Sequence, residues 1–205
     1  MVSELSPRNT ELAGRRPPLP VKIVIAGGFG VGKTTTVASI SDITPLRTEA
    51  VITGVAAGVD DLRHVPDKAS TTVAMDFGRI AIDDDLTLYL FGTPGQDRFG
   101  FMWNDVAEGA LGALVIVDSR RLSDCYPAVD YFEKLRLPFV VAVNSFDGEI
   151  AHDLDAIRWA LAIDDNIPVV PFDARSRLSV RDALLVILGV ALNQRQQGLT
   201  AGAGH

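Results

Sequence analysis

The stretch VKIVIAGGFGVGKTTTVASI, residues Val21–Ile40, decides the fold of this chain. It begins with a β-branched run of strand length, passes through a glycine cluster and continues with helical spacing. Between the two lies the pattern Gly27-x-x-x-x-Gly32-Lys33-Thr34. Glycines in such a turn let successive backbone N–H groups point inward, and a helix N-terminus adds partial positive charge. The stretch therefore predicts a strand, an anion-binding loop and a helix, in that order.

This pattern is a Walker A motif in the context that the motif requires, after a strand and before a helix. Lys33 can reach the β- and γ-phosphates of a nucleotide, and the Thr34 hydroxyl can ligate Mg²⁺. The preceding strand disfavours the alternative, a glycine-rich turn that only caps a helix. The residues that we expect along the nucleotide are Gly28, Phe29, Gly30, Val31, Gly32, Lys33, Thr34 and Thr35.

Apolar runs of strand length recur along the chain and alternate with stretches of helical spacing. The predicted strands are Val21–Ala26, Ala74–Ile82, Leu86–Phe91, Ala113–Val117, Phe139–Val143 and Ile167–Pro171. The predicted helices are Lys33–Ser41, Asp97–Glu108, Asp124–Leu135, His152–Ala162 and Ser179–Gln194. Three aspartates at 83–85 make a hairpin-like connection between the second and third strands. The order predicts an α/β fold, a P-loop NTPase three-layer α/β/α sandwich with a mostly parallel six-stranded sheet and one antiparallel edge strand. Its site should lie at the carboxyl ends of the strands.

Composition limits the classes of protein that this chain can be. With 205 residues, 47% of them hydrophobic, it can bury the core of one domain. The net charge of −7 and the absence of a Lys/Arg-rich block argue against a nucleic-acid surface. The single cysteine, Cys125, excludes an internal disulfide and favours a reducing cytoplasm. The three histidines show no ligand spacing, so no zinc or iron site is expected.

The two ends differ from the middle in composition. Residues 1–20, rich in Ser, Pro and Arg, have no apolar secretory segment and are predicted to be a mobile arm. Residues 21–195 form the predicted domain, and the small residues of 196–205 a mobile tail. No apolar run is long enough to span a bilayer. We therefore expect a cytoplasmic chain without direct membrane insertion, recruited to a membrane only through partners.

Four further segments carry a family resemblance. They are Ser70–Gly78 (STTVAMDFG), Leu90–Phe99 (LFGTPGQDRF), Val140–Gly148 (VVAVNSFDG) and Val169–Ser176 (VVPFDARS). In this order, with the Walker A loop, the chain resembles the Ras-like small GTPases across Val21–Asn193. The likeness is greatest to their bacterial branch, which includes the gliding-motility type and the GTPases encoded in actinobacterial signalling operons. The resemblance implies a Ras-like domain that binds GTP or GDP with Mg²⁺.

The resemblance also assigns roles to single residues. Thr72 matches the switch I threonine that closes on Mg²⁺ and the γ-phosphate. Gly95 and Gln96 match the switch II glycine and the glutamine that orients the attacking water. The expected catalytic residues are therefore Gln96, Lys33 and Thr72, and the expected metal ligands Thr34 and Thr72.

Asn144 and Asp147 match the pair that reads guanine, and Ala174, followed by Arg175, matches the alanine whose N–H contacts the guanine carbonyl. A carboxylate at Asp147 can accept hydrogen bonds from both the ring N–H and the exocyclic amine of guanine, which adenine does not offer together. A site built in this way leaves buried groups unpaired with the wrong base. Alone, NSFDG reads as a turn, but its place after a strand and downstream of a Walker A loop favours guanine.

Three positions depart from the Ras-like pattern. Gly92 stands where an aspartate usually holds a Mg²⁺-bound water, so we expect weaker retention of Mg²⁺. Ser145 replaces the lysine whose stem covers the base, and the ring of neighbouring Phe146 is expected to face the core. Phe29 replaces a small residue beside the γ-phosphate. Its ring either crowds Gln96 and a partner's arginine, which slows hydrolysis, or points outward and covers the nucleotide.

Arginines and acids outside these motifs leave alternatives open. The long segment Thr44–Ser70 contains Arg47 and Arg63, either of which is a candidate arginine supplied in cis or a solvated charge. Asp118, Arg120 and Arg121 follow the fourth predicted strand, as loop residues or partner contacts.

The resemblance implies a GTP-dependent switch with slow hydrolysis, in which GTP orders switch I and switch II and hydrolysis releases them. It also implies regulator and effector proteins, among them a roadblock-type regulator. The alternative is a nucleotide-binding module with negligible catalysis, a pseudo-GTPase scaffold, in which Gly92 and Phe29 mark lost turnover. A P-loop kinase or ATPase, the third option, would lack both the guanine-reading aspartate and the switch II glutamine.

Overall fold

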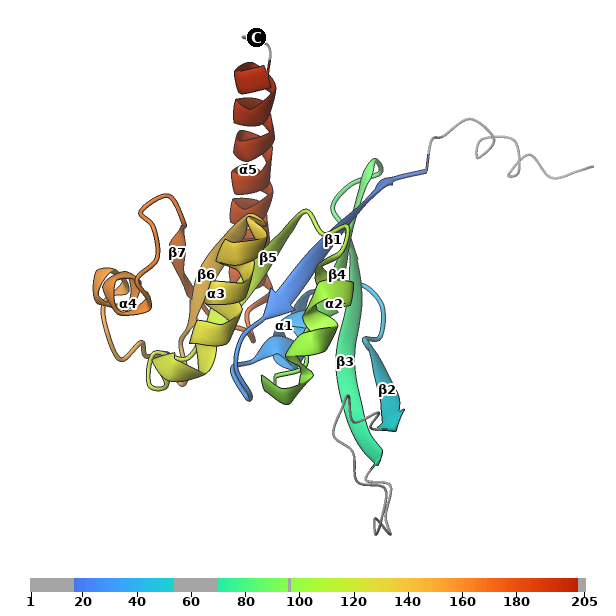
Figure 1. The fold of residues 1–205 in the computed structure, drawn as a ribbon. Coiled ribbons are helices and arrows are strands. Elements are labelled where there is room, and N and C mark those ends of the chain that lie inside the picture. The colour runs from blue at the N-terminus through green and yellow to red at the C-terminus, as the bar shows by residue number, and fades with distance from the viewer. Residues whose placement is uncertain (1–16, 54–69, 96, 203–205) are drawn as a thin grey trace, which may run out of the picture.

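A computed structural model describes residues 17–53, 70–95 and 97–202, and within them the side chains of 47–53, 70–74, 97–99 and 199–202 are left out. In this part of the chain a sheet of seven strands has the order β2-β3-β4-β1-β5-β6-β7 (Figure 1). The strands are β1 (Leu19–Ala26), β2 (Leu46–Thr53), β3 (Ser70–Ala81), β4 (Leu86–Gly92), β5 (Gly112–Val117), β6 (Phe139–Asn144) and β7 (Val169–Phe172). Among these strands only β3 runs opposite to the rest: its pairs with β2 and β4 are antiparallel, and the other pairs are parallel.

The helices follow the predicted order. They are α1 (Lys33–Ile40), α2 (Trp103–Ala107), α3 (Tyr126–Leu135), α4 (Leu154–Leu161) and α5 (Arg177–Gly202), with 3₁₀ turns at Asp97–Met102 and Leu122–Cys125. The predicted helix Asp97–Glu108 is thus half 3₁₀. At the start of α4 the Asp153 carboxylate caps the helix, accepting from the Ala156 N–H at 2.7 Å. The α/β P-loop NTPase architecture predicted from the sequence is confirmed.

The prediction of six strands with the antiparallel strand at the edge needs a correction. Leu46–Thr53 lies inside the segment that the sequence marks as a long connection, and it pairs with β3 as an additional strand, β2. The antiparallel strand β3 is therefore second from the edge. LRTEAVIT mixes charged, small and apolar residues, as an edge strand with one polar face does, and such a segment lacks the continuous apolar run of a buried parallel strand.

The core forms on both faces of the sheet because successive side chains of each strand point to opposite faces. Along β1, Ile23 and Ile25 pack with α1 and α5, whereas Val24 and Ala26 pack with α2, α3 and α4. Figure 1 shows α2 and α3 in front of the sheet and α1 and α5 behind it. The central strands β5 and β6 are buried along their whole length, as doubly covered strands must be. The packing on both faces fixes the carboxyl ends of these strands, and the candidate site lies at this edge of the sheet.

The last helix is longer than predicted. α5 runs from Arg177 to Gly202, and its C-terminal half projects beyond the sheet in Figure 1. The helix therefore continues past residue 195, where the sequence placed the domain boundary. No helix in the described ranges is long and apolar enough to cross a membrane.

Candidate functional site

The phosphate loop connects the end of β1 at Ala26 to the start of α1 at Lys33. Gly32 occupies the N-cap position of α1 with φ 110°, a left-handed conformation that L side chains rarely adopt. A Cβ at this position would lie 3.0 Å from Asn144 Nδ2 and 3.1 Å from Ala174 Cβ. The loop therefore packs directly against the residues predicted to read the base, and only glycine fits between them.

Lys33 is buried, 8% exposed, and its ammonium group points back into the loop. Nζ donates to the carbonyl oxygens of Gly27 at 2.8 Å and Gly28 at 2.6 Å. Burial lowers the pKa of Lys33 to about 8, and the nearby Asp76 carboxylate acts in the opposite direction. At neutral pH this lysine thus presents a poorly solvated positive charge, which an anion can stabilise.

A cavity of about 400 Å³ opens beside this lysine. It is lined by Phe29, Gly30, Gly32, Lys33, Thr34, Thr35, Asp76, Thr93 and Gly95. Gly95, the predicted switch II glycine, lies against the loop: a Cβ there would be 2.6 Å from Lys33 Nζ and 3.1 Å from Phe29 Cα. The structure thus brings the predicted switch II glycine and the predicted phosphate ligands to one place.

Two polar side chains in this cavity escaped the sequence analysis. Asp76, on β3, accepts a hydrogen bond from Thr34 Oγ1 at 2.5 Å. Thr93 is 3% exposed, and its hydroxyl has no hydrogen-bond partner among the described residues. A buried hydroxyl that lines a cavity without a partner indicates a place for a polar ligand. The sequence did contain a sign of Asp76: it is an acid within the mostly apolar segment AMDFG, and a half-buried strand normally avoids an acid there.

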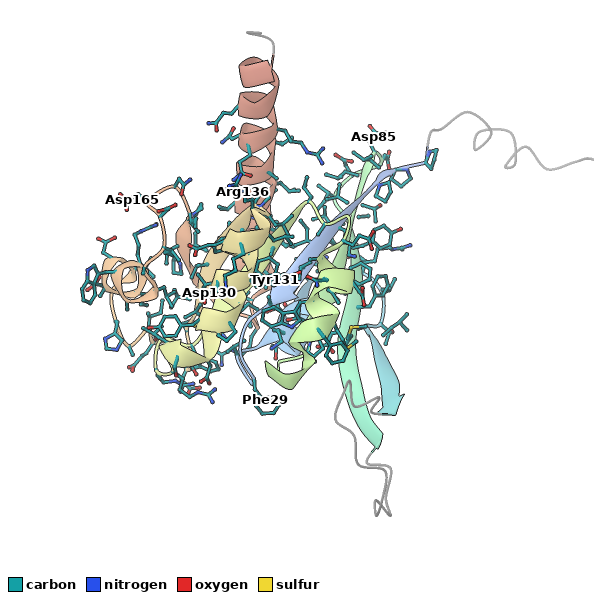
Figure 2. All side chains as sticks on the ribbon, viewed as in Figure 1. Phe29, Asp85, Asp130, Tyr131, Arg136 and Asp165 are labelled. Atoms are coloured by element: carbon teal, nitrogen blue, oxygen red, sulfur yellow. The ribbon has the colours of Figure 1, made fainter. Side chains whose placement is uncertain are left out.

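Phe29 lies at the mouth of the same cavity, and this residue is 67% exposed. In Figure 2 it projects from the phosphate loop at the border of the domain. Of the two orientations that the sequence left open, this one agrees with the ring that points outward. Gln96 lies outside the described residues, as does Arg63, and of Thr72 and Arg47 only the strand backbone is described, in β3 and β2.

A second hollow of about 150 Å³ adjoins the phosphate cavity and shares Gly30, Gly32 and Thr35 with it. Its other lining residues are Asn144, Ser145, Phe146, Asp147, Asp173, Ala174 and Arg175. The structure therefore brings together every described residue that the sequence assigned to base recognition. The hollow lies where β6 and β7 end, at the carboxyl edge of the sheet.

Asn144 forms hydrogen bonds with both the phosphate loop and the loop after β7. Its buried amide donates from Nδ2 to the Val31 carbonyl at 2.9 Å and accepts at Oδ1 from the Ala174 N–H at 3.0 Å. The predicted bond from Ala174 N–H to a guanine carbonyl would therefore have to be shared with Asn144. One side chain thus fixes the phosphate loop and the loop after β7 relative to each other.

Removal of this amide should weaken the whole domain. Asn144→Ala leaves a buried N–H and a buried carbonyl without partners, so we expect a loss of about 1–3 kcal/mol in the free energy of unfolding. Urea unfolding followed by circular dichroism measures it. Asn104→Ala removes an exposed amide whose Oδ1 accepts from the Tyr131 hydroxyl, and it is the control, with an expected loss below about 1 kcal/mol. Equal losses in the two variants would contradict the bridging role.

Asp147 lies in a tight turn. Its φ is 58° and that of Gly148 is 87°, and the Glu149 N–H donates to the Phe146 carbonyl at 3.1 Å. Positive φ at both central residues is the pattern of a type I′ Asp-Gly turn. Asp147 is exposed and lines the base hollow. The two interpretations of NSFDG are therefore compatible: Asp147 belongs to the turn, and in that turn it lines the hollow predicted to hold the base.

Arg120 lies over the ring of Phe146, next to the position where the Ras-like pattern has a lysine. The buried Asp118 carboxylate accepts from Arg120 Nε and Nη2, both at 2.9 Å, and these bonds hold the pKa of Asp118 below its usual range. The Arg120 guanidinium lies 4.1 Å from the centre of the Phe146 ring. Phe146 is half-buried and lines the hollow, so the expectation that its ring faces the core is wrong. A stacked Arg–Phe pair stands beside Ser145 instead of a lysine stem.

Arg121 braces the phosphate loop from outside. Its Nη2 donates to the Phe29 carbonyl at 3.4 Å, and its guanidinium forms ion pairs with Asp118 and Asp124, each at 3.5 Å. Arg175 is held in a similar way, because its guanidinium donates to the Asp173 carboxylate at 3.0 Å. These arginines therefore have structural partners within the loops that surround the nucleotide site.

The lowered pKa of Lys33 predicts a pH dependence. Bound phosphates hold its proton, so above about pH 8 binding must take up a proton that the free protein has lost. Nucleotide affinity should fall about tenfold from about pH 7 to about pH 9. The contribution of Lys33 to stability changes in the opposite direction: above about pH 8 the unfolded chain binds more protons than the folded one, so stability rises. Fluorescence titration measures the affinity and urea unfolding the stability, at matched pH values. An affinity that does not change from about pH 7 to about pH 9 would contradict the predicted loss.

The order of this sheet, with a phosphate loop after its first strand, defines a domain with the P-loop NTPase fold. It is similar in fold to the G domain of the iron transporter FeoB from T. maritima, with a TM-score of 0.56 and 18% identity over 84% of this chain and 99% of that one. The FeoB G domain from Methanococcus jannaschii gives 0.54 and 15% over 85% and 98%. At such identities the likeness concerns the fold alone.

The chain belongs to a family described as conserved hypothetical ATP binding proteins, whose model matches residues 25–188. The matched region begins in β1 and includes both the phosphate loop and the base hollow. An uncharacterised protein of Methanocaldococcus jannaschii, MJ1339, is 30% identical over 129 residues, which are 62% of this chain and 71% of that protein. The family description and the geometry of the site thus both indicate nucleotide binding, in a fold that suits it.

Proposed function

We propose that this protein is a small GTP-binding switch that hydrolyses GTP slowly. The observation that carries the proposal is the pair of adjoining hollows, one beside Lys33 and the other beside Asp147, which share three lining residues. A phosphate chain in the first hollow and a purine in the second would be joined through the shared residues Gly30, Gly32 and Thr35. An anionic, polar ligand would satisfy the poorly solvated Lys33 ammonium and the Thr93 hydroxyl, which has no partner in the described part of the chain.

Guanine is the base that the second hollow favours. Asp147 offers two acceptor oxygens at its border, with Arg120 and Arg175 close enough for their charges to interact with it. Guanine presents a ring N–H and an exocyclic amine side by side, whereas adenine has the acceptor N1 and a C–H in the corresponding places. The family description names ATP, and competition between GTP and ATP distinguishes the two bases.

The oxygen donors in the phosphate cavity fit Mg²⁺, which prefers oxygen ligands and usually retains several waters. Thr34 Oγ1 lies at the cavity, and Thr72 is the second ligand that the sequence predicts. Mg²⁺ would neutralise charge that develops between the β- and γ-phosphates. Lys33 would hold the phosphates, and Gln96, the predicted water-orienting residue, follows Gly95 at the loop. Since Gly95 packs on Lys33 and Phe29, a γ-phosphate in this place would have to change or share that contact, which gives a switch its two states.

Competition binding tests the base. The purified protein is denatured and the released nucleotide identified by chromatography; the emptied protein is then titrated with fluorescent GDP against GTP and ATP, with Mg²⁺. We expect guanine nucleotide at release and GTP to compete at least about 100-fold better than ATP. ATP that competes equally well or better contradicts the guanine assignment.

A pseudo-GTPase scaffold is the second candidate, favoured by Phe29 at the mouth of the phosphate cavity and by the glycine at position 92. Single-turnover hydrolysis separates the two. Gln96→Ala should lower the rate of a true GTPase, whereas a scaffold has no rate to lose. In either case we propose partners that read the nucleotide state: regulators and effectors, with a roadblock-type regulator and membrane-linked components as the bacterial Ras-like branch suggests.

A further inference from the structure

Position 92 carries glycine, but the space of the missing side chain is not open. A Cβ added at Gly92 would lie 3.2 Å from Asp76 Cβ and 3.5 Å from Asp76 N. The register explains this contact: Phe77 on β3 pairs with Phe91 on β4, so Asp76 and Gly92 are the next pair toward the site. The glycine on β4 therefore makes room for a carboxylate that comes from β3.

The Asp76 carboxylate also reaches the chemistry of the phosphate cavity. It lines that cavity, and it accepts from Thr34 Oγ1, the hydroxyl that the Walker A pattern assigns to Mg²⁺. Its charge is near enough to Lys33 Nζ to act on that ammonium. One carboxylate is thus in contact with the predicted metal ligand and close to the phosphate-binding lysine.

We infer that Asp76 is the acid of the Mg²⁺ site, transposed from the switch II strand position 92 to β3, where it accepts from the water shell of the ion that Thr34 ligates. The inference rests on the proposed function. Mg²⁺ bound with nucleotide phosphates is usually held by one or two carboxylates or their water-mediated equivalents. Asp76 would therefore supply the carboxylate that position 92 lacks, so that Mg²⁺ retention need not be weak.

The transposition changes what the ion is connected to. Asp76 belongs to the same strand, β3, as Thr72, the predicted switch I threonine. Both predicted protein contacts of the ion beyond Thr34 then come from one strand, which leads directly out of the switch I segment. Loss of the ion should loosen the β3 end of the site first, whereas Gly95 keeps its contacts with the phosphate loop.

A swap of the two positions tests the inference on the full chain. Asp76→Asn keeps the shape and an acceptor oxygen for Thr34 but removes the charge. The double variant Asp76→Gly/Gly92→Asp moves the carboxylate to β4 into space that the first change vacates. Asp155→Asn, an exposed acid on α4 far from the site, is the matched control. Release of fluorescent GDP is followed against free Mg²⁺, and Mn²⁺ binding to the nucleotide complex is followed by electron paramagnetic resonance.

For Asp76→Asn we expect the Mg²⁺ concentration that half-maximally slows GDP release to rise about 10–100-fold, with a matching loss of Mn²⁺ affinity. The double variant should recover most of this loss, and Asp155→Asn should behave as the wild type. An Asp76→Asn protein that binds GDP with unchanged Mg²⁺ dependence overturns the inference and leaves the proposed function standing. A wild-type protein that binds no guanine nucleotide overturns both.

Discussion

Lys33→Met is expected to lower the affinity for guanine nucleotides by at least about 100-fold while the domain remains folded. Among the hydrogen bonds described for it, Nζ donates to the carbonyls of Gly27 and Gly28, and Lys33 lines the phosphate cavity, so a bound phosphate would lie within its reach. Charge-assisted hydrogen bonds in a poorly solvated site are stronger than those in water. Methionine keeps most of the volume of the stem and removes the charge.

Equilibrium titration with fluorescent GDP measures the loss, and urea unfolding checks that the variant is folded. Lys134→Met, at an exposed lysine on α3, is the control and should bind as the wild type. Because burial depresses the pKa of Lys33 to about 8, its charge costs folding energy at neutral pH, so the variant should not lose stability in proportion to its loss of binding. Retained affinity in Lys33→Met would remove the phosphate cavity from the proposed site.

The sequence predicted those parts of the fold whose cause is local. β5 and β6 are buried along their length, and such strands read as continuous apolar runs whatever lies beside them. The phosphate loop was predictable for the same reason: Gly32 must adopt a left-handed φ at the start of α1, and the motif that needs this is contiguous. Asn144 and Asp147 were predictable because Asn144 ends β6 and Asp147 follows it closely, at an edge that parallel strands share.

The features that sequence analysis missed depend on pairing across the sheet. β2 carries charged side chains in an edge position, so no periodic signal separated it from a loop. Asp76 and Gly92 are neighbours only because β3 pairs with β4 in one register, and a shift of one residue would point the carboxylate to the other face. Phe146 turned toward the site because Arg120, from the loop after β5, lies over its ring. Each of these is a contact between segments far apart in the chain.

Asp147→Asn is expected to lower the affinity for GTP by about 100-fold, equivalent to about 2.7 kcal/mol, and to raise that for xanthosine triphosphate. The change replaces one acceptor oxygen by a donor amide; guanine then meets a donor with its own exocyclic amine, whereas xanthine offers a carbonyl there. The turn should survive, because asparagine tolerates the left-handed φ of 58° as well as aspartate does.

Competition of GTP, xanthosine triphosphate and ATP against fluorescent GDP and its xanthine analogue measures the exchange of preference. Asp165→Asn, at an exposed loop acid labelled in Figure 2, controls for a general change in charge and should leave all three affinities unchanged. A P-loop ATPase would show no exchange, because adenine makes no paired contact with a carboxylate in this place. Unchanged preference for guanine in Asp147→Asn would mean that the second hollow holds something other than the base, while the phosphate site of Lys33 would stand. Lys33→Met and Asp147→Asn therefore test the two ends of the same nucleotide independently. A guanine-specific site requires that Lys33→Met lose affinity for guanine nucleotides and that Asp147→Asn change its preference from guanine to xanthine.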